Sequence, residues 1–376
     1  MNLHMNTQFP VTNNLIHLNH AAVGPWPQVT SDAVKKFAEE NLQVGSKHYL
    51  AWMETEKNLR KNLAQLINAT SEDEIALVKN TSEGLSFVAY GLPWKQGENV
   101  VGIQQEFPSN RFVWNSLSSK GVEFRQFDLE NSPDPEQGLF DLCDENTRLI
   151  AVSAVQYHNG FRMDLNKIGQ FCKDRNILFC VDAIQQIGAL PFDVQAIQAD
   201  FVIADGHKWL LSAEGLGLFY VRKGVMDKLD ILQYGWHMVD KLSDYSVQQF
   251  ELAQSAKRFE CGSPNMLGIH AMNASVELLL DVGMSKIGER VIKRSKLLIE
   301  QLEPIKHIEI LSESTEQRLS GIITFRSHKI ANDELYQYLS KEQVLCAQRG
   351  GGIRLSPHFY TPLEQLEKVI SRIKCF

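Results

Sequence analysis

The sequence predicts an α/β fold with a large domain built on a mainly parallel sheet, followed by a smaller α/β domain. Short, continuously apolar, β-rich runs alternate with amphipathic stretches between about residues 75 and 222. Continuous apolar runs suit strands that are covered on both faces, and their alternation with helical stretches is typical of a parallel sheet. The same alternation returns near the C-terminus after a long helical stretch, which predicts the second domain.

The elements of the large domain follow from these patterns in chain order. The helix-rich stretch 30–67 is expected to pack on this domain, and 165–176 carries the helix period between two strands. The expected strands are 98–103, 122–127, 148–155, 177–184, 200–204 and 216–221.

The elements of the smaller domain are equally distinct. We expect a long helix over 275–305, strands at 320–326 and 353–357, and helices near 332–341 and from about 362 to the end. The expected division is an N-terminal segment at 1–20, a large domain at 21–260 and a small domain at 261–376.

Composition and charge exclude several classes of function. The net charge of the 376 residues is −7 and no basic stripe is present, so nucleic acid is not an expected partner. No apolar run reaches the roughly 18 residues of a membrane span, and the first residues do not resemble a signal peptide. The six cysteines are scattered without a CxxC pair. We therefore expect no bound metal, no disulfide framework and a cytoplasmic location.

Polar residues stand where several apolar runs stop. Asp182 ends one run, and Lys208 follows the next one within the sequence VIADGHKWLLSAEGLGLFYV. Ligands of such sheets bind at the carboxyl ends of the strands, where these side chains converge if the strands are parallel. A shielded lysine has a lowered pKa and forms Schiff bases with carbonyls such as that of pyridoxal phosphate, whose ring nitrogen needs an acidic partner. A surface lysine and a helix-capping aspartate are the alternative for either residue alone.

The joint pattern VDAIQ…ADGHKWLLSAEGLGLFYV resembles the signature of the class V aminotransferase group of fold-type I pyridoxal-phosphate enzymes. That group includes cysteine desulfurases, kynureninase, isopenicillin N epimerase-like enzymes and cysteine lyases. The resemblance runs from LNHAAVGP (18–25) to LSPHFY (355–360). It implies the aspartate aminotransferase-like fold with a seven-stranded sheet. It also implies that Lys208 carries the cofactor, Asp182 holds its ring nitrogen, Gln185 bonds its ring hydroxyl and His207 contacts its phosphate.

Two further stretches are candidates for cofactor contacts. In KNTSEGLSFVA (79–89), a turn that opens a helix offers N–H groups and the hydroxyls of Thr81 and Ser82 to a phosphate, although an ordinary helix cap explains the turn as well. It resembles the group's G-T-T-E-G turn. In EFPSNRFVW (106–114), the resemblance places Phe107 as the ring that stacks on the cofactor. The alternative is a core phenylalanine.

Two more matches complete the cofactor site. In AVSAVQYHNGFRMDL (151–165), Gln156 and Tyr157 are candidates to touch the cofactor ring. RFECGSPN (258–265) resembles the group's R-F-E-x-G-T-P-N, which implies that Ser263 reaches the phosphate of a neighbouring subunit and that the protein is a homodimer with a shared active site. The composition of GSPN also predicts an ordinary turn.

The stretch CAQRGGGIRLSPHFYTP (346–362) supplies the substrate contacts. The resemblance assigns Arg354 to the substrate carboxylate, which a guanidinium grips by two parallel hydrogen bonds, and Arg349 is a second candidate. A surface salt bridge is the alternative for either arginine. The three glycines between them suggest a close backbone approach or a flexible lid.

Three departures from the family pattern shape the expected function. Cys346 precedes Arg349, and only three glycines separate that arginine from Ile353, so the loop that presents a desulfurase thiol is absent. Asp205 stands where many relatives have a hydroxyl residue beside the phosphate. We therefore expect an enzyme, but not a true cysteine desulfurase. It acts on an amino acid through a Schiff base to pyridoxal 5′-phosphate and is aminotransferase-like. The alternatives are a cysteine or cystine C–S β-lyase, an amino-acid epimerase, and a degenerate binding protein that keeps the fold.

Overall fold

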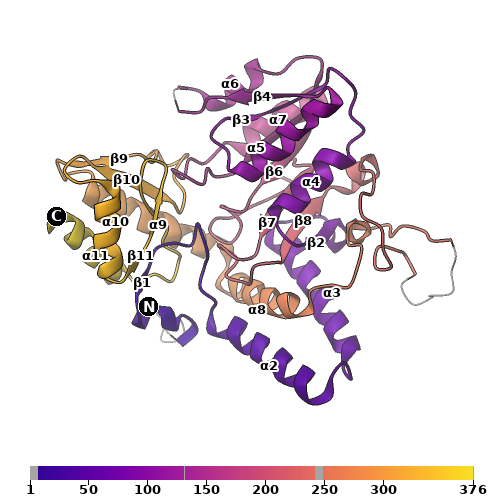
Figure 1. Cartoon of the computed structure of the whole chain (residues 1–376), viewed down its shortest axis with the longest axis horizontal. Helices are drawn as coiled ribbons and strands as arrows, with labels where there is room; N and C mark the ends of the chain where they lie inside the picture. Colours follow the sequence, from indigo (N-terminus) through magenta and orange to yellow (C-terminus); the bar gives the residue numbers. More distant parts are fainter. Residues whose placement is uncertain (1–6, 131, 242–248, 376) are drawn as a thin grey trace.

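The large domain contains the predicted seven-stranded, mainly parallel sheet (Figure 1). The computed structural model describes residues 7–130, 132–241 and 249–375, so the first six residues of the expected N-terminal segment lie outside it. The strand order is β2-β8-β7-β6-β5-β3-β4, and β8 runs antiparallel to both of its neighbours. The strands are β2 (Ile75–Val78), β3 (Asn99–Ile103), β4 (Glu123–Phe127), β5 (Thr147–Ser153), β6 (Leu178–Asp182), β7 (Phe201–Asp205) and β8 (Gly217–Val221).

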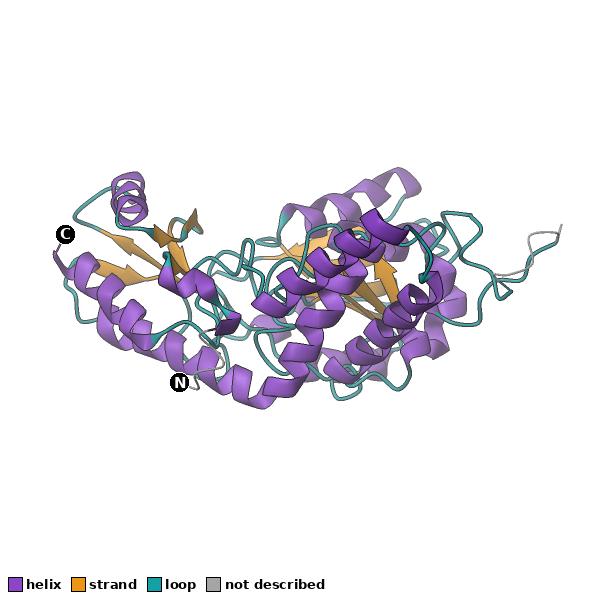
Figure 2. Cartoon of the chain, turned by 90° about the horizontal axis from the view of Figure 1, so that it is seen from below, coloured by secondary structure: helices purple, strands orange, loops and turns teal. Residues whose placement is uncertain are grey.

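Helices cover both faces of this sheet, which explains the continuous apolar runs (Figure 2). In β5, Ile150 and Val152 belong to the core on one face, whereas Leu149 and Ala151 belong to the core on the other. Successive side chains of a strand point to opposite faces, so a strand covered twice must be apolar throughout. The helices of this part are α2 (Gln28–Val44), α3 (Tyr49–Leu66), α4 (Thr81–Gly91), α5 (Pro108–Asn115), α6 (Pro135–Asp141), α7 (Leu165–Arg175) and α8 (Met266–Val282).

The smaller domain has a four-stranded antiparallel sheet in the order β12-β13-β10-β9. Its strands are β9 (Ile308–Ile310), β10 (Ile323–Ser327), β12 (Ala347–Arg349) and β13 (Gly352–Leu355), and its helices are α9 (Met284–Leu302), α10 (Asn332–Lys341) and α11 (Leu363–Cys375). The N-terminal strand β1 (Ile16–His17) pairs in parallel with β11 (Val344–Leu345), so the start of the described chain is tied to this domain. Short 3-10 helices span Pro10–Asn13, Glu72–Glu74, Ser116–Lys120, Lys223–Lys228 and Ala256–Phe259.

The structure corrects one expected element. The single helix predicted over 275–305 is wrong, because Gly283 adopts a φ of +86° and separates α8 from α9. Such a left-handed backbone favours glycine, which ends helices in this way. The α8 helix then packs on α2 and α3, and α9 lies beside the small sheet in Figure 1.

Register places the predicted polar residues at one edge of the large sheet. Ser153 pairs with Asp182, and Asp182 pairs with Ile203, so the parallel strands β5 and β6 end together and β7 ends two residues further on, at Asp205. Lys208 follows β7 directly at that edge. Within the described residues, no helix combines the length and apolarity needed to cross a membrane, and no cluster of three or more His, Cys, Asp or Glu side chains is arranged to hold a metal ion.

Candidate active site

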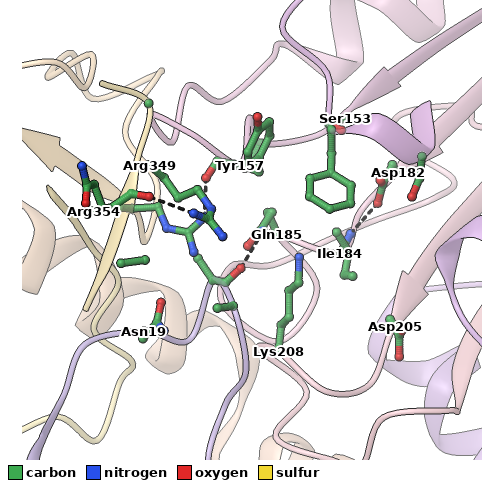
Figure 3. Close-up of a pocket in the computed structure, with 18 of the residues that line it drawn as sticks. Asn19, Ser153, Tyr157, Asp182, Ile184, Gln185, Asp205, Lys208, Arg349 and Arg354 are labelled. Carbon is green, nitrogen blue, oxygen red and sulfur yellow. Dashed lines mark hydrogen bonds between the residues drawn. The ribbon is translucent and has the colours of Figure 1, made fainter. Parts of the chain in front are cut away.

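A cavity of about 990 Å³ lies between the carboxyl edge of the large sheet and the β12–β13 hairpin of the small domain. Figure 3 shows Arg349 and Arg354 on one side of it, Asp182 and Asp205 on the other, and Lys208 between them. The cavity is lined by these predicted residues: Thr81, Ser82, Phe107, Tyr157, Asp182, Gln185, His207, Lys208, Arg349 and Arg354. Of the predicted site residues, Ser263 and the candidate Gln156 are not among the residues that line it.

Lys208 projects its amine into this cavity from the turn after β7. Its Nζ atom lies 5.7 Å from the centre of the Phe107 ring. Burial lowers the pKa of Lys208 to about 8, although the nearby Asp182 opposes this shift. The turn is closely packed, since a Cβ atom on Gly24 would come within 2.2 Å of the Lys208 carbonyl oxygen. The arrangement therefore holds a nucleophilic amine near neutral pH.

Asp182 is a buried carboxylate that ends β6. Its Oδ1 accepts from the backbone N–H of Ile184 at 3.1 Å, and its Oδ2 accepts from Asn110 Nδ2 at 2.8 Å. Burial raises the pKa of Asp182 to about 6, and the hydrogen bonds and Lys208 only partly offset that effect. A protonated ring nitrogen placed against this carboxylate would favour its ionised form.

A second buried acid, Glu106, lies behind Asp182 and was not predicted. It accepts from the Ser153 backbone N–H at 2.6 Å, from the Ser153 hydroxyl and from Gln156 Nε2 at 3.0 Å. Asn110 joins the two acids, because its Nδ2 lies 3.4 Å from Ser153 Oγ as well as bonding Asp182. Burial raises the pKa of Glu106 to about 7, against the effect of its hydrogen bonds. Asn110 was not predicted either. One indication in the sequence that it lies near the site is its position, because Asn110 follows Phe107 by three residues, in the first turn of the helix that begins at Pro108.

The N-terminus of α4 faces the cavity. Its residues fit both roles considered from the sequence, the ordinary helix cap and the phosphate site. Asn80 is the capping residue, and its Oδ1 accepts from the Glu83 N–H at 3.0 Å. The hydroxyl of Thr81 is buried without a hydrogen-bond partner in the described chain. Ser82 Oγ lies 2.8 Å from Ser109 Oγ. The unpartnered Thr81 hydroxyl at a helix N-terminus fits a phosphate group, because the N–H groups and the helix dipole favour an anion there.

Asp205, which stands where many relatives have a hydroxyl residue, contacts His207. Its Oδ1 lies 3.1 Å from Nδ1 of His207, so the carboxylate faces the imidazole. Gln185 is held by two hydrogen bonds: its Oε1 accepts from Trp209 Nε1 at 2.8 Å, and its Nε2 donates to the Ala21 carbonyl at 3.0 Å. One N–H of Gln185 remains to donate to a ligand.

Two of the aromatic side chains that line the cavity lie against each other. Phe107 is 44% exposed, and its ring meets that of Tyr157 edge-on with centroids 5.2 Å apart. The alternative of a core phenylalanine is thus wrong for Phe107. The candidate Gln156 is fully buried, lies outside the residues that line the cavity and donates to Glu106. A ring contact by Gln156 is therefore wrong, because its amide satisfies a buried acid.

The two arginines come from one tight hairpin. Arg354 is buried on β13 and donates from Nη1 to the Tyr157 carbonyl at 2.6 Å. Arg349 is exposed at the end of β12. Gly350 and Gly351 connect the strands with φ values of +59° and +77°, as a two-residue hairpin turn requires. A Cβ atom on Gly350 would lie 2.7 Å from the His158 carbonyl oxygen. Of the two expected roles of the glycines, the geometry supports the close approach.

Two residues lie apart from the cavity chemistry. Ser263 is exposed and is not among the residues that line the cavity of its own chain. Cys346 contacts the cavity but is only 2% exposed and packs in the core of the small domain. Burial raises the pKa of its thiol to about 12, so the thiolate is disfavoured there.

Comparison with known proteins gives one family and consistent relatives. The family model described as aminotransferase class-V matches residues 16–369. A probable cysteine desulfurase of Methanothermobacter thermautotrophicus is 29% identical over 95% of this chain and 94% of its own. The uncharacterized aminotransferase YcbU of Bacillus subtilis is 28% identical over 97% of this chain and 95% of its own. The solved complex of the cystine C–S lyase C-DES with cysteine persulfide superposes with a TM-score of 0.91 at 22% identity, covering 98% of this chain and all of that one, which shows the shared fold.

Proposed function

We propose that this chain, which belongs to the aminotransferase class-V family, is a pyridoxal-phosphate-dependent enzyme that transfers the amino group of an α-amino acid. The cofactor and an amino-acid substrate are properties of the family. Transamination rests on one observation, the cavity that brings the Lys208 amine together with Asp182 and Arg354.

The residues present fit the cofactor. The unpartnered Thr81 hydroxyl and the N-terminus of α4 suit its phosphate, with Ser82 and His207 beside them. Asp182 suits the ring nitrogen, Gln185 the ring hydroxyl and Phe107 the ring face. When bound, pyridoxal phosphate supplies an electron sink that stabilises negative charge at the substrate Cα atom.

The remaining chemistry belongs to the side chains. Arg354 binds the substrate carboxylate and thereby orients the bonds at Cα toward Lys208. With a pKa of about 8, the Lys208 amine can take a proton from Cα near neutral pH. The Phe107 ring across from this amine carries no titratable proton, so Phe107 is not a second base. One base suits transamination better than epimerisation, which needs proton transfer on both faces of the carbon.

The missing thiol loop argues against a sulfur transfer to the enzyme itself. Arg349 connects to β13 through a two-residue turn, and the thiol of Cys346 is buried with a raised pKa. A desulfurase that forms a persulfide needs an accessible thiolate at this place. The same observation favours β-elimination at a carbon–sulfur bond as a second candidate, because that reaction releases the sulfur without a protein thiol.

The visible absorption spectrum of the purified protein tests the proposal. A yellow protein whose band shifts with an amino acid and returns with a keto acid would be an aminotransferase. Release of pyruvate and sulfur compounds from cysteine or cystine would favour the second candidate. A protein that stays colourless with added cofactor would be a degenerate member of the fold, and the proposal would be wrong.

We also propose a homodimer with a shared active site. Ser263 is exposed beside Pro264 and Asn265, as a residue would be that reaches a second subunit. Large apolar side chains are exposed on the same chain, among them Leu42, Leu50, Phe112, Tyr234 and Phe250. Sedimentation equilibrium measures this directly, and a monomer at micromolar concentration would contradict it. The unpaired cysteines of the described chain support a reducing, cytoplasmic location.

A further inference from the structure

We infer that the substrate carries a second acidic group, which Arg349 binds while Arg354 binds the α-carboxylate. This inference rests on the proposed function and narrows the amino-acid substrate to an acidic class. It would give the two arginines of the β12–β13 hairpin different partners.

The hairpin register places both side chains on one face. Arg354 lies opposite Ala347, and Arg349 follows Ala347 by two residues. Residues two apart on a strand share a face, and directly opposite residues do so too. Arg349 and Arg354 are therefore diagonal neighbours that both face the cavity, as Figure 3 shows.

Each guanidinium keeps a complete edge for a ligand. Arg354 uses Nη1 on the Tyr157 carbonyl, and its buried Nε has no hydrogen-bond partner in the described chain. Arg349 uses Nη1 on the Gln348 carbonyl, at 2.9 Å. The edge formed by Nε and Nη2 thus remains on both residues, and each such edge matches one carboxylate bidentately.

No acidic group of the described residues neutralises this pair. No carboxylate oxygen lies within 4.0 Å of either guanidinium in that part of the chain. The two acids that line the cavity, Asp182 and Asp205, lie at the sheet edge across from the hairpin. Two cations held together without an anion favour a dianionic ligand, because a single carboxylate would compensate only one of them.

The hairpin fixes this spacing. Gly350 and Gly351 form its turn, and Asn332 Nδ2 donates to the Gly351 carbonyl at 2.8 Å. Burial, and then the charge of Arg349, lower the pKa of Arg354 to about 10. Arg354 therefore stays charged at neutral pH and is repelled by the neighbouring Arg349 guanidinium until an anion is bound.

Calorimetric titration of the cofactor-loaded protein with unreactive acids tests the inference separately from the reaction. Glutarate carries two carboxylates and pentanoate one on a chain of equal length. We expect glutarate to bind about 10- to 100-fold more tightly, the range of one charge-assisted pair. Arg349→Gln should abolish that preference while leaving pentanoate within about 2-fold, whereas Lys368→Gln, an exposed charge on α11, should change neither affinity.

The outcomes separate the two proposals. Equal affinity for both acids, or an Arg349→Gln variant that weakens both equally, would overturn the second acid site and assign both arginines to one carboxylate. In the reaction itself, aspartate and glutamate should shift the cofactor band at about 10-fold lower concentration than asparagine and glutamine. If no amino acid shifts the band but glutarate binds selectively, the proposed function fails and the site for a dianion stands.

Discussion

Asn110 donates a hydrogen bond from Nδ2 to Oδ2 of Asp182 at 2.8 Å, and both side chains are buried. Asp182 receives this bond in addition to the N–H of Ile184. Hydrogen bonds to a carboxylate favour its charged form, which is the form that a protonated ring nitrogen needs as its partner. The contact therefore connects α5 to the proposed cofactor site through Asp182.

Replacing Asn110 by Leu should weaken cofactor binding. The variant leaves Asp182 without its side-chain donor and should raise the pKa of Asp182 above its present value of about 6. We expect the dissociation constant of pyridoxal phosphate to rise about 10-fold or more, measured by titration of the apoprotein. Asn115→Leu, at an exposed position of the same helix, is the control. Equal affinities in both variants would mean that Asn110 only fills space.

Replacing Glu106 by Gln should change how stability depends on pH. The pKa of Glu106 is raised from 4.5 to about 7, so between these values the folded protein holds a proton that the unfolded chain has lost. Stability of the wild type therefore falls as pH rises through that window. Relative to wild type, the variant apoprotein should gain about 1.4 kcal/mol per pH unit there, measured by urea unfolding.

The exposed residue Glu130 offers the matching control for this experiment. Asp182 titrates in part of the same window in both proteins, and its charge is one cause of the raised pKa of Glu106. The curves of Glu130→Gln and wild type should run in parallel. If the Glu106→Gln curve runs in parallel too, the buried carboxyl is already ionised at pH 4.5 and its pKa is not raised.

The capture of cofactor by the apoprotein should depend on the protonation of Lys208. Only the neutral amine is nucleophilic, and burial lowers the pKa of Lys208 to about 8. The initial rate at which the visible band develops should rise with pH around a midpoint near 8, instead of near the usual value of 10.5. Lys208→Ala should develop no such band at any pH. A midpoint near 10 in the wild type would show that the amine is solvated.

Replacing Arg354 by Ala should affect substrate binding and leave the cofactor in place. The variant loses the buried guanidinium that faces the substrate side of the cavity. We expect KM for the amino acid to rise about 10- to 100-fold with unchanged cofactor content, measured by steady-state kinetics and absorbance. Arg326→Ala, on the exposed side of the neighbouring strand β10, is the control. A KM near wild type would refute the assignment of the carboxylate to Arg354.

The two turn glycines should differ in their tolerance of Ala. Both have positive φ, which costs a residue with a side chain about 1 kcal/mol. A Cβ on Gly350 would also meet the His158 carbonyl at 2.7 Å, whereas nothing lies within 4 Å of a Cβ on Gly351. In thermal unfolding, Gly350→Ala should therefore be the less stable variant. Equal stabilities would mean that the hairpin moves away from His158 without cost.

The large sheet could be read from the sequence because local patterns encode it. Most strands of that sheet are apolar runs, because a strand covered on both faces must be apolar along its length. The edge strand β4, which reads EFRQF, is the exception. The helices near the start of the small domain were harder to predict, because Gly283 interrupts a continuous helical pattern through its backbone conformation alone. The hairpin strand β12 was not predicted either, because three residues before a glycine turn carry no detectable period.

The family, and the residues that gather at the sheet edge, could be predicted from the order of the amino acids alone. Lys208 and Asp182 follow apolar runs directly, and parallel strands of known direction bring such positions together. The burial and the hydrogen-bond partners of those residues depend on the tertiary structure. Glu106 reads as a surface acid in a polar stretch, and it becomes buried because Ser153 and Gln156, 47 and 50 residues away, fold over it with their donors. A charge's pKa and partners depend on what surrounds it in space, and the order of residues along the chain does not specify that.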